Sequence, residues 1–179
     1  MRWCYCNGAG QAKDGVGVRL EFDRDGLIYD IRNAAYIAGD VMGEEKQHSH
    51  HVLVDVGEEG NIDRVNRVLE LAMASVKELL YPFTRRDVSV GDVVNDGIGG
   101  TGDYVLELSV PRSYSRSSVE LLVHVIHEYL VASVLYDWAL MVDVSLAESW
   151  LLRRQEAADE IKGLKHSRGQ AFTRRSSVF

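Results

Sequence analysis

The segment from Ser113 to Val142 constrains this chain more than any other part of its sequence. It predicts one long helix, which begins at Ser113 or Ser115 and is apolar on most of its sides. The apolar positions are Val119, Leu121, Leu122, Val123, Val125, Ile126, Leu130, Val134, Leu135, Trp138 and Leu140. A helix of this kind lies in the middle of a bundle or is covered by a partner chain. The segment therefore predicts a mainly α protein built around one central helix.

Three further segments have the apolar spacing of helices, with apolar residues three and four positions apart. The first begins at Asp23 to Asp25 and ends at Gly39. The second has Asn61 as a plausible N-cap and stops before Pro82, because a residue that precedes proline is pushed out of helical geometry. The third runs from Val144 to Gly169. With the central helix, these segments predict a four-helix bundle-like domain.

Two strand candidates lie between the second and the central helix. They are residues 88–94 and 104–110, and a glycine-rich loop joins them. We expect an inserted β-hairpin over residues 88–110. The stretch 18–22 also alternates apolar and polar residues, which indicates a short strand or an extended segment.

The domain organisation follows from these elements. Residues 1–17 are glycine-rich and lack periodicity, so we interpret them as an N-terminal arm. Residues 18–169 form the helical domain that carries the hairpin, and residues 170–179 form a basic C-terminal tail. The predicted fold class is mainly α: a four-helix bundle-like domain with an inserted β-hairpin and extended N- and C-terminal arms.

The loop between the two strand candidates contains G-I-G-G-T-G, which fits the G-x-G-x-x-G pattern of dinucleotide sites. Such a site needs a helix directly after the glycines, because the helix N-terminus receives the phosphates. Here a strand candidate follows, and Asp96 and Asp103 would repel phosphate. We therefore expect the tip of a hairpin that orders against a partner chain. The partner-contacting residues predicted in it are Gly97, Ile98, Gly99, Gly100, Thr101 and Gly102.

His124, His127 and Glu128 are the candidates for metal ligands on the central helix. Their order, H-x-x-H-E, matches neither of the zinc-protease signatures H-E-x-x-H and H-x-x-E-H. The two histidines share a helix face at i and i+3, so a shared metal remains an alternative. The favoured interpretation is a polar stripe, which includes Glu120 and meets solvent or a neighbouring subunit.

Other residues that often carry chemistry favour plain structural roles. A disulfide between Cys4 and Cys6 would be strained, and two cysteines fall short of a closed zinc site. His48, His50 and His51 lie in a polar loop over residues 41–51, which we expect to be solvated. No cofactor and no metal are expected.

The composition is that of an ordinary globular protein, with 46% hydrophobic and 26% charged residues. No run of about 18 apolar residues occurs, so we expect no membrane span. No secretory signal stands at the N-terminus, which favours the cytosol. The net charge is −7, which argues against general nucleic-acid binding. The end of the chain is basic and carries no acidic residue from Leu164 on, so we expect it to dock on an acidic surface of a neighbouring copy.

The order of these parts carries a resemblance. A helix ends in Leu79-Leu80-Tyr81-Pro82-Phe83, and the strand 104–111 follows after a variable loop. The long helix ends in Val134-Leu135-Tyr136-Asp137-Trp138, and the last helix carries a charged run within residues 147–162. The basic tail closes the order at 173–179. In this order the chain resembles the head–tail connector (adaptor) proteins of tailed bacteriophages, including neck proteins of phages that infect gut Bacteroidetes.

The resemblance implies a structural virion protein without catalytic residues. Such a protein forms a homo-oligomeric ring of about twelve copies. It binds the portal protein on one side and a tail or stopper protein on the other, and it is assembled in the host cell cytoplasm. Genomic DNA passes through the ring without sequence-specific binding. In the tail we expect partner contacts from Phe172, Arg174, Arg175 and Phe179.

Three alternatives stay open. The chain could be another neck or tail component, such as a tail-completion or stopper protein, although its helical content disfavours this. It could be a metal-dependent enzyme that uses His124, His127 and Glu128. It could also be a helical regulatory or toxin–antitoxin-type binding module.

Overall fold

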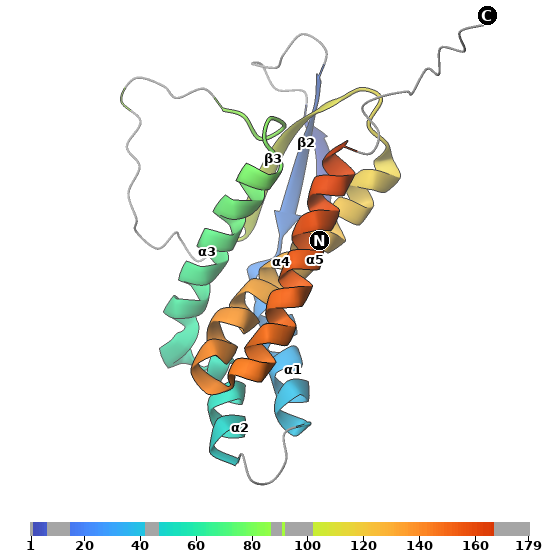
Figure 1. Cartoon of the computed structure of the whole chain (residues 1–179). Helices are drawn as coiled ribbons and strands as arrows, with labels where there is room; N and C mark the ends of the chain where they lie inside the picture. Colours follow the sequence, from blue (N-terminus) through green and yellow to red (C-terminus); the bar gives the residue numbers. More distant parts are fainter. Residues whose placement is uncertain (1, 7–14, 42–46, 87–90, 92–101, 167–179) are drawn as a thin grey trace, which may run out of the picture.

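The computed structural model describes residues 2–6, 15–41, 47–86, 91 and 102–166, and it is mainly helical (Figure 1). The α-helices of this described part are α1 (Arg24–Asp40), α2 (Gln47–Val54), α3 (Ile62–Leu79), α4 (Arg116–Val142) and α5 (Val144–His166). Two short 3-10 helices, η2 (Asp55–Gly57) and η3 (Glu59–Asn61), connect α2 to α3. The prediction of a mainly α protein is confirmed.

The predicted central helix is α4, which packs against α5 along most of its length and also contacts α3, α1 and α2. Leu122, Ile126 and Leu130 are almost completely shielded from solvent. By length and composition alone, α4 is apolar enough to cross a membrane, but 72% of its most apolar window is buried inside this fold. Its apolar residues therefore form the core.

The ends of the helices follow local capping and proline rules. The Asp23 carboxylate accepts a hydrogen bond from the backbone N–H of Gly26 at 2.7 Å, which caps α1 as the sequence predicts. Asn61 occupies the N-cap position of α3, but its side chain donates to the Asp55 carbonyl oxygen at 2.9 Å and does not cap the helix. The helix α3 ends before Pro82, as expected.

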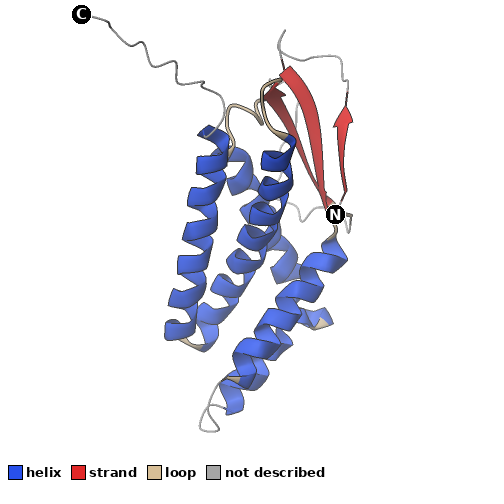
Figure 2. Ribbon diagram, turned by 90° about the vertical axis from the view of Figure 1, so that its right-hand side faces the viewer, coloured by secondary structure: helices blue, strands red, loops and turns tan. Residues whose placement is uncertain are grey.

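The strands form an antiparallel sheet in the order β1-β2-β3 (Figure 2). They are β1 (Arg2–Cys6), β2 (Gly15–Phe22) and β3 (Tyr104–Pro111). Although β2 and β3 lie far apart in the sequence, they pair directly, with Leu20 opposite Leu106. This register places the apolar positions of both strands on one face, where they are buried: Val18, Leu20, Phe22, Leu106, Leu108 and Val110.

The pairing of β3 with β2 is one that the predicted hairpin over residues 88–110 did not include. The segment 104–111 is a strand as expected, and its described partner is β2, a pairing that buries the apolar faces of both strands together. The other half of the hairpin, residues 88–94, lies outside the described residues except for Gly91. The predicted N-terminal arm over residues 1–17 is corrected, since it contains β1 and the start of β2.

The polar loop predicted over residues 41–51 is also corrected, because residues 47–51 belong to α2. Tertiary packing explains the difference. Leu53 and Val56 are fully buried, and the indole N–H of Trp138 on α4 donates to the Val52 carbonyl oxygen at 2.9 Å. These contacts hold a segment in helical form that its own polar sequence does not predict.

The sheet and α1 lie end to end along one side of the long helices α4 and α5 (Figure 2). The helix α3 runs beside β3, and the turn after α3 meets that strand, because the backbone N–H of Ser109 donates to the Phe83 carbonyl oxygen at 2.8 Å. The space between α3 and β3 is therefore closed at the Ser109 end by this turn, and α3 and β3 border it along its length.

Candidate interaction surfaces

Most of the predicted partner contacts lie outside the described residues. This holds for Gly97–Thr101 in the glycine loop and for Phe172, Arg174, Arg175 and Phe179 in the tail. Gly102 is described: it is exposed directly before β3, with open space around its Cα atom. Its place at the start of β3 puts it at the rim of a groove between α3 and β3.

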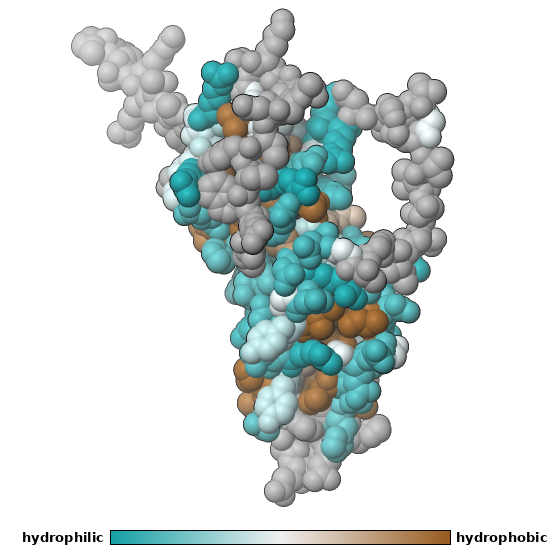
Figure 3. Space-filling model, turned by 180° about the vertical axis from the view of Figure 1, so that it is seen from behind, coloured by the Kyte–Doolittle hydropathy of each residue, from teal (hydrophilic) through white to brown (hydrophobic). Residues whose placement is uncertain are grey.

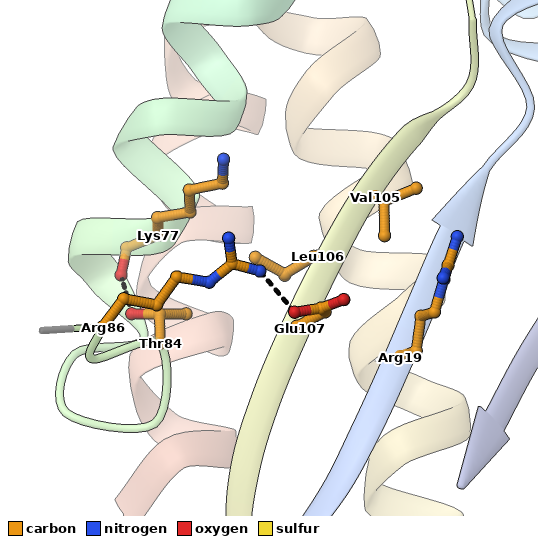
Figure 4. Close-up of a pocket in the computed structure, with 7 residues that line it drawn as sticks. All are labelled: Arg19, Lys77, Thr84, Arg86, Val105, Leu106 and Glu107. Carbon is orange, nitrogen blue, oxygen red and sulfur yellow. Dashed lines mark hydrogen bonds and ion pairs between the residues drawn. The ribbon is translucent and has the colours of Figure 1, made fainter. Parts of the chain in front are cut away.

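This groove, which we call the edge groove, consists of two adjoining hollows that share Lys77 and Val105, one of which is drawn in Figure 4. One hollow has a cavity volume of about 410 Å³ and is lined by Glu70, Met73, Ala74, Lys77, Gly102, Asp103, Tyr104 and Val105. The other has a cavity volume of about 310 Å³ and is lined by Arg19, Lys77, Thr84, Arg86, Val105, Leu106 and Glu107. One wall is α3 and the other is the outer edge of β3.

The two ends of the edge groove carry opposite charges. Arg86 lies at the end near the turn that follows α3, where it forms an ion pair with Glu107, and Arg19 lines the same hollow from β2 (Figure 4). Glu70 and Asp103 lie at the other end, beside Gly102. An extended ligand with one basic end therefore matches the groove in only one orientation.

The turn at the basic end is held by its own hydrogen bonds. The hydroxyl of Thr84 donates to the Lys77 carbonyl oxygen at 2.6 Å, which satisfies a carbonyl group in the last turn of α3 (Figure 4). The backbone N–H of Phe83 donates to the Leu80 carbonyl oxygen at 2.8 Å. These bonds fix the position of the turn against β3.

The backbone of β3 is open toward the edge groove. Along a strand, the N–H and C=O groups of alternate residues point to the same edge. Since Ser109 bonds outward to the turn, Val105 and Glu107 also point their backbone groups outward, toward the groove. No described residue accepts a hydrogen bond from their N–H groups. Among the described residues, the groove therefore presents strand backbone without a partner between two charged ends.

Tyr104 lies at the acidic end of the edge groove. Burial raises the pKa of its phenol, the nearby Glu70 carboxylate raises it further, and Arg24 opposes this rise. The phenol is therefore neutral at physiological pH and can donate a hydrogen bond to a group in the groove.

The candidate metal ligands on α4 lie in different surroundings. His124 and Glu128 are exposed, whereas the imidazole Nε2 of His127 lies 2.7 Å from the Asp30 carboxylate of α1, and the His127 side chain is only 13% exposed. Within the described ranges, no three His, Cys, Asp or Glu side chains are grouped so as to hold a metal ion. His127 thus links α4 to α1, a contact that the sequence does not reveal, because spacing along one helix contains no information about a second helix.

Another hollow lies apart from the edge groove, over α1 and η2, and has a cavity volume of about 500 Å³. Tyr29 and Tyr36 stand exposed along it, and Arg32 lies so close to Gly57 that any Cβ atom there would clash with it. Figure 3 shows apolar side chains reaching the surface of the lower half of the molecule between hydrophilic ones.

Large apolar side chains are also exposed where α4 turns into α5. We call Leu140, Met141 and Val144 the α4–α5 corner; about half or more of each side chain faces solvent, and Val144 is 64% exposed. Contiguous exposed apolar residues of this size mark sites of contact with other proteins.

No family model, no curated protein and no solved structure matches this chain significantly. The function proposed below therefore rests on the residues and elements described above and on the resemblance in their order.

Proposed function

We propose that this chain is a structural virion protein that forms a ring at the phage neck, joins the portal to the tail and surrounds the DNA channel. The observation that carries the proposal is the order of the elements α3, β3, α4 and α5, in which α3 ends just before Pro82. This is the order in which the chain resembles head–tail connector proteins.

Two different exposed surfaces support a ring. In a ring, each copy meets its two neighbours through two distinct patches, because the contact is heterologous. The α4–α5 corner offers exposed apolar side chains, and the edge groove offers open strand backbone with charged ends. These surfaces differ in chemistry and come from different elements, as a head-to-tail contact requires.

The charge of the chain supports a channel through which DNA slides. Tight DNA binding requires many Lys or Arg contacts to phosphates. The net charge of −7 opposes such contacts over most of the surface. A ring of this chain therefore surrounds DNA without sequence-specific binding.

Native mass spectrometry of the full chain, alone and with a portal protein, tests the proposal. We expect a closed species of about a dozen copies. Deleting residues 170–179 leaves a folded monomer, checked by circular dichroism, but abolishes the ring. A matched control replaces the same residues with a Gly/Ser segment of equal length, which separates the loss of sequence from the loss of length. A chain that stays monomeric at every concentration, even with the portal protein, contradicts the proposal.

A further inference from the structure

We propose that the edge groove accepts residues 170–179 of a neighbouring copy as an added β-strand beside β3. The inference rests on the ring proposed above and names the contact that joins its copies. Strand addition of this kind derives its affinity from main-chain hydrogen bonds and its specificity from side chains on either side.

The open edge of β3 is the first observation that supports it. An exposed strand edge presents N–H and C=O groups that pair readily with another chain. Here those groups belong to Val105 and Glu107, and the turn at Phe83 closes the edge at Ser109. The place for a strand is therefore bounded at one end and open at the end that Gly102 marks.

The lining of the groove suits an extended segment. Paired strands lie about 4.8 Å apart, and a strand added to the outer edge of β3 would lie on the side where α3 lines the groove. Met73 and Ala74 on α3 face this space, and Leu106 lines it from the strand side. Successive side chains of an added strand can thus point in turn to this apolar wall and to solvent.

The tail has the composition of a strand. Residues 170–179 read Q-A-F-T-R-R-S-S-V-F and contain no proline. Phe172, Thr173, Val178 and Phe179 are residues enriched in strands. The segment also lacks glycine, which weakens strand interiors.

Charge sets the orientation of the added strand. The tail carries Arg174 and Arg175 and no acidic residue. Glu70 and Asp103 form the acidic end of the edge groove, whereas Arg86 lies at the other end, where it would repel a guanidinium. The two arginines therefore lie at the Gly102 end of the groove.

The fold favours the tail of a neighbour over the tail of the same chain. Successive contacts connect the end of α5 to the closed end of the groove. The Tyr114 hydroxyl donates to the Leu164 carbonyl oxygen of α5, and the Tyr114 ring packs edge-on against the ring of Phe83. The Phe83 carbonyl oxygen in turn accepts from the backbone N–H of Ser109. The turn that follows α3 thus stands between the end of α5 and the groove. At the Gly102 end, no residue that the structure describes closes the groove to a neighbouring tail.

Amide hydrogen exchange of the full chain, read at single residues, tests the inference. In the assembled protein we expect the N–H groups of Val105 and Glu107 to exchange at least about 100-fold more slowly than in a sample diluted to monomer. A T173P/S177P variant, whose tail cannot form a regular strand, loses this protection. The N–H of Ser109 is the internal reference, since its bond to Phe83 keeps it slow in every sample.

Each other result overturns the inference in a recognisable way. Fast exchange at Val105 and Glu107 in an intact ring removes the strand but leaves the proposed function standing. Protection that survives dilution assigns the groove to the same chain, and protection that survives the proline variant assigns it to another segment. The absence of any ring overturns the inference together with the proposed function.

A charge reversal tests the orientation separately. E70K places a cation beside the arginines and raises the dissociation constant of the ring, and R174E in the same chain restores assembly. The matched control is R86E at the opposite end, which R174E does not compensate. Equal rescue of both variants contradicts the stated orientation.

Discussion

At the scale of single residues, Tyr114 joins three elements. Its hydroxyl donates to the Leu164 carbonyl oxygen of α5 at 3.2 Å, and its ring meets the ring of Phe83 edge-on at 6.0 Å between centroids. The residue lies in the turn after β3, where its backbone N–H donates to the Pro111 carbonyl oxygen at 2.9 Å. Its phenol is half-buried, and this burial raises its pKa.

This pKa shift predicts a loss of stability in alkali. A tyrosine with a raised folded pKa contributes stability that is fully present below the unfolded value of about 10 and is lost as the pH rises through the folded value. We expect Y114F to lose about 1 kcal/mol at pH 8, where its hydrogen bond is missing. From pH 9.5 to 11 the variant should lose less stability than the wild type does. Urea unfolding at each pH measures both effects.

The control for this prediction is Y36F. Tyr36 is exposed on α1 and, unlike Tyr114, is not held at a junction of elements. Its variant should show the same alkaline loss as the wild type. An unchanged alkaline loss in Y114F would assign that loss to other tyrosines, Tyr104 first among them.

Residue-level features were predictable from the sequence where the chemistry is local. The cap at Asp23 and the end of α3 before Pro82 follow from rules that act over a few residues. The pairing of His127 with Asp30 does not, because it depends on how two helices are rotated against each other. The edge groove was not predictable from the sequence for the same reason, because its lining comes from β2, α3, β3 and the turn that follows α3.

At the scale of elements, α4 determines how stable the fold is. Leu130 is fully buried in this helix, while Leu121, two and a half turns earlier, is 43% exposed. We expect L130A to lower the free energy of unfolding by about 2–5 kcal/mol, because it leaves a cavity in the core. L121A, a matched change on the same helix, should cost about 0.5 kcal/mol or less. Chemical denaturation of both variants measures the difference, and similar losses would contradict the central position of α4.

The long helices were predictable because their apolar residues repeat with the helical period over many turns. Strand pairing was not, since alternation along 104–110 indicates which residues share a face but not which strand lies beside them. The sequence separation of β2 and β3 favoured a nearer partner, residues 88–94, which lie outside the described residues except for Gly91. The helix α2 was not predicted, because most of its sequence is polar. It is held in place by contact with α4 and by the buried side chain of Leu53.

At the scale of the whole molecule, electrostatics bears on the association of copies that we propose. The chain carries a net charge of −7, while its tail is basic and the proposed binding groove has an acidic end. Contacts between such charges weaken as salt shortens the screening length from about 10 Å at 0.1 M to about 3 Å at 1 M.

We therefore predict that assembly weakens in high salt. Between 0.1 M and 1 M NaCl, the dissociation constant of the ring should rise by about tenfold, as measured by sedimentation velocity. An R174Q/R175Q variant assembles more weakly at low salt and should show a smaller salt effect. Assembly that strengthens with salt would assign the contact to the apolar α4–α5 corner instead.

The pairing of β2 with β3 also has a consequence during synthesis. Phe22 pairs with Tyr104, so the ribosome must produce all of α1, α2 and α3 between the two strands. At typical elongation rates this takes roughly 4–16 s. During that interval the apolar side chains of Val18, Leu20 and Phe22 lack the strand that completes their sheet. The nascent N-terminal strand is therefore expected to be a binding target for chaperones until residue 111 has left the ribosome.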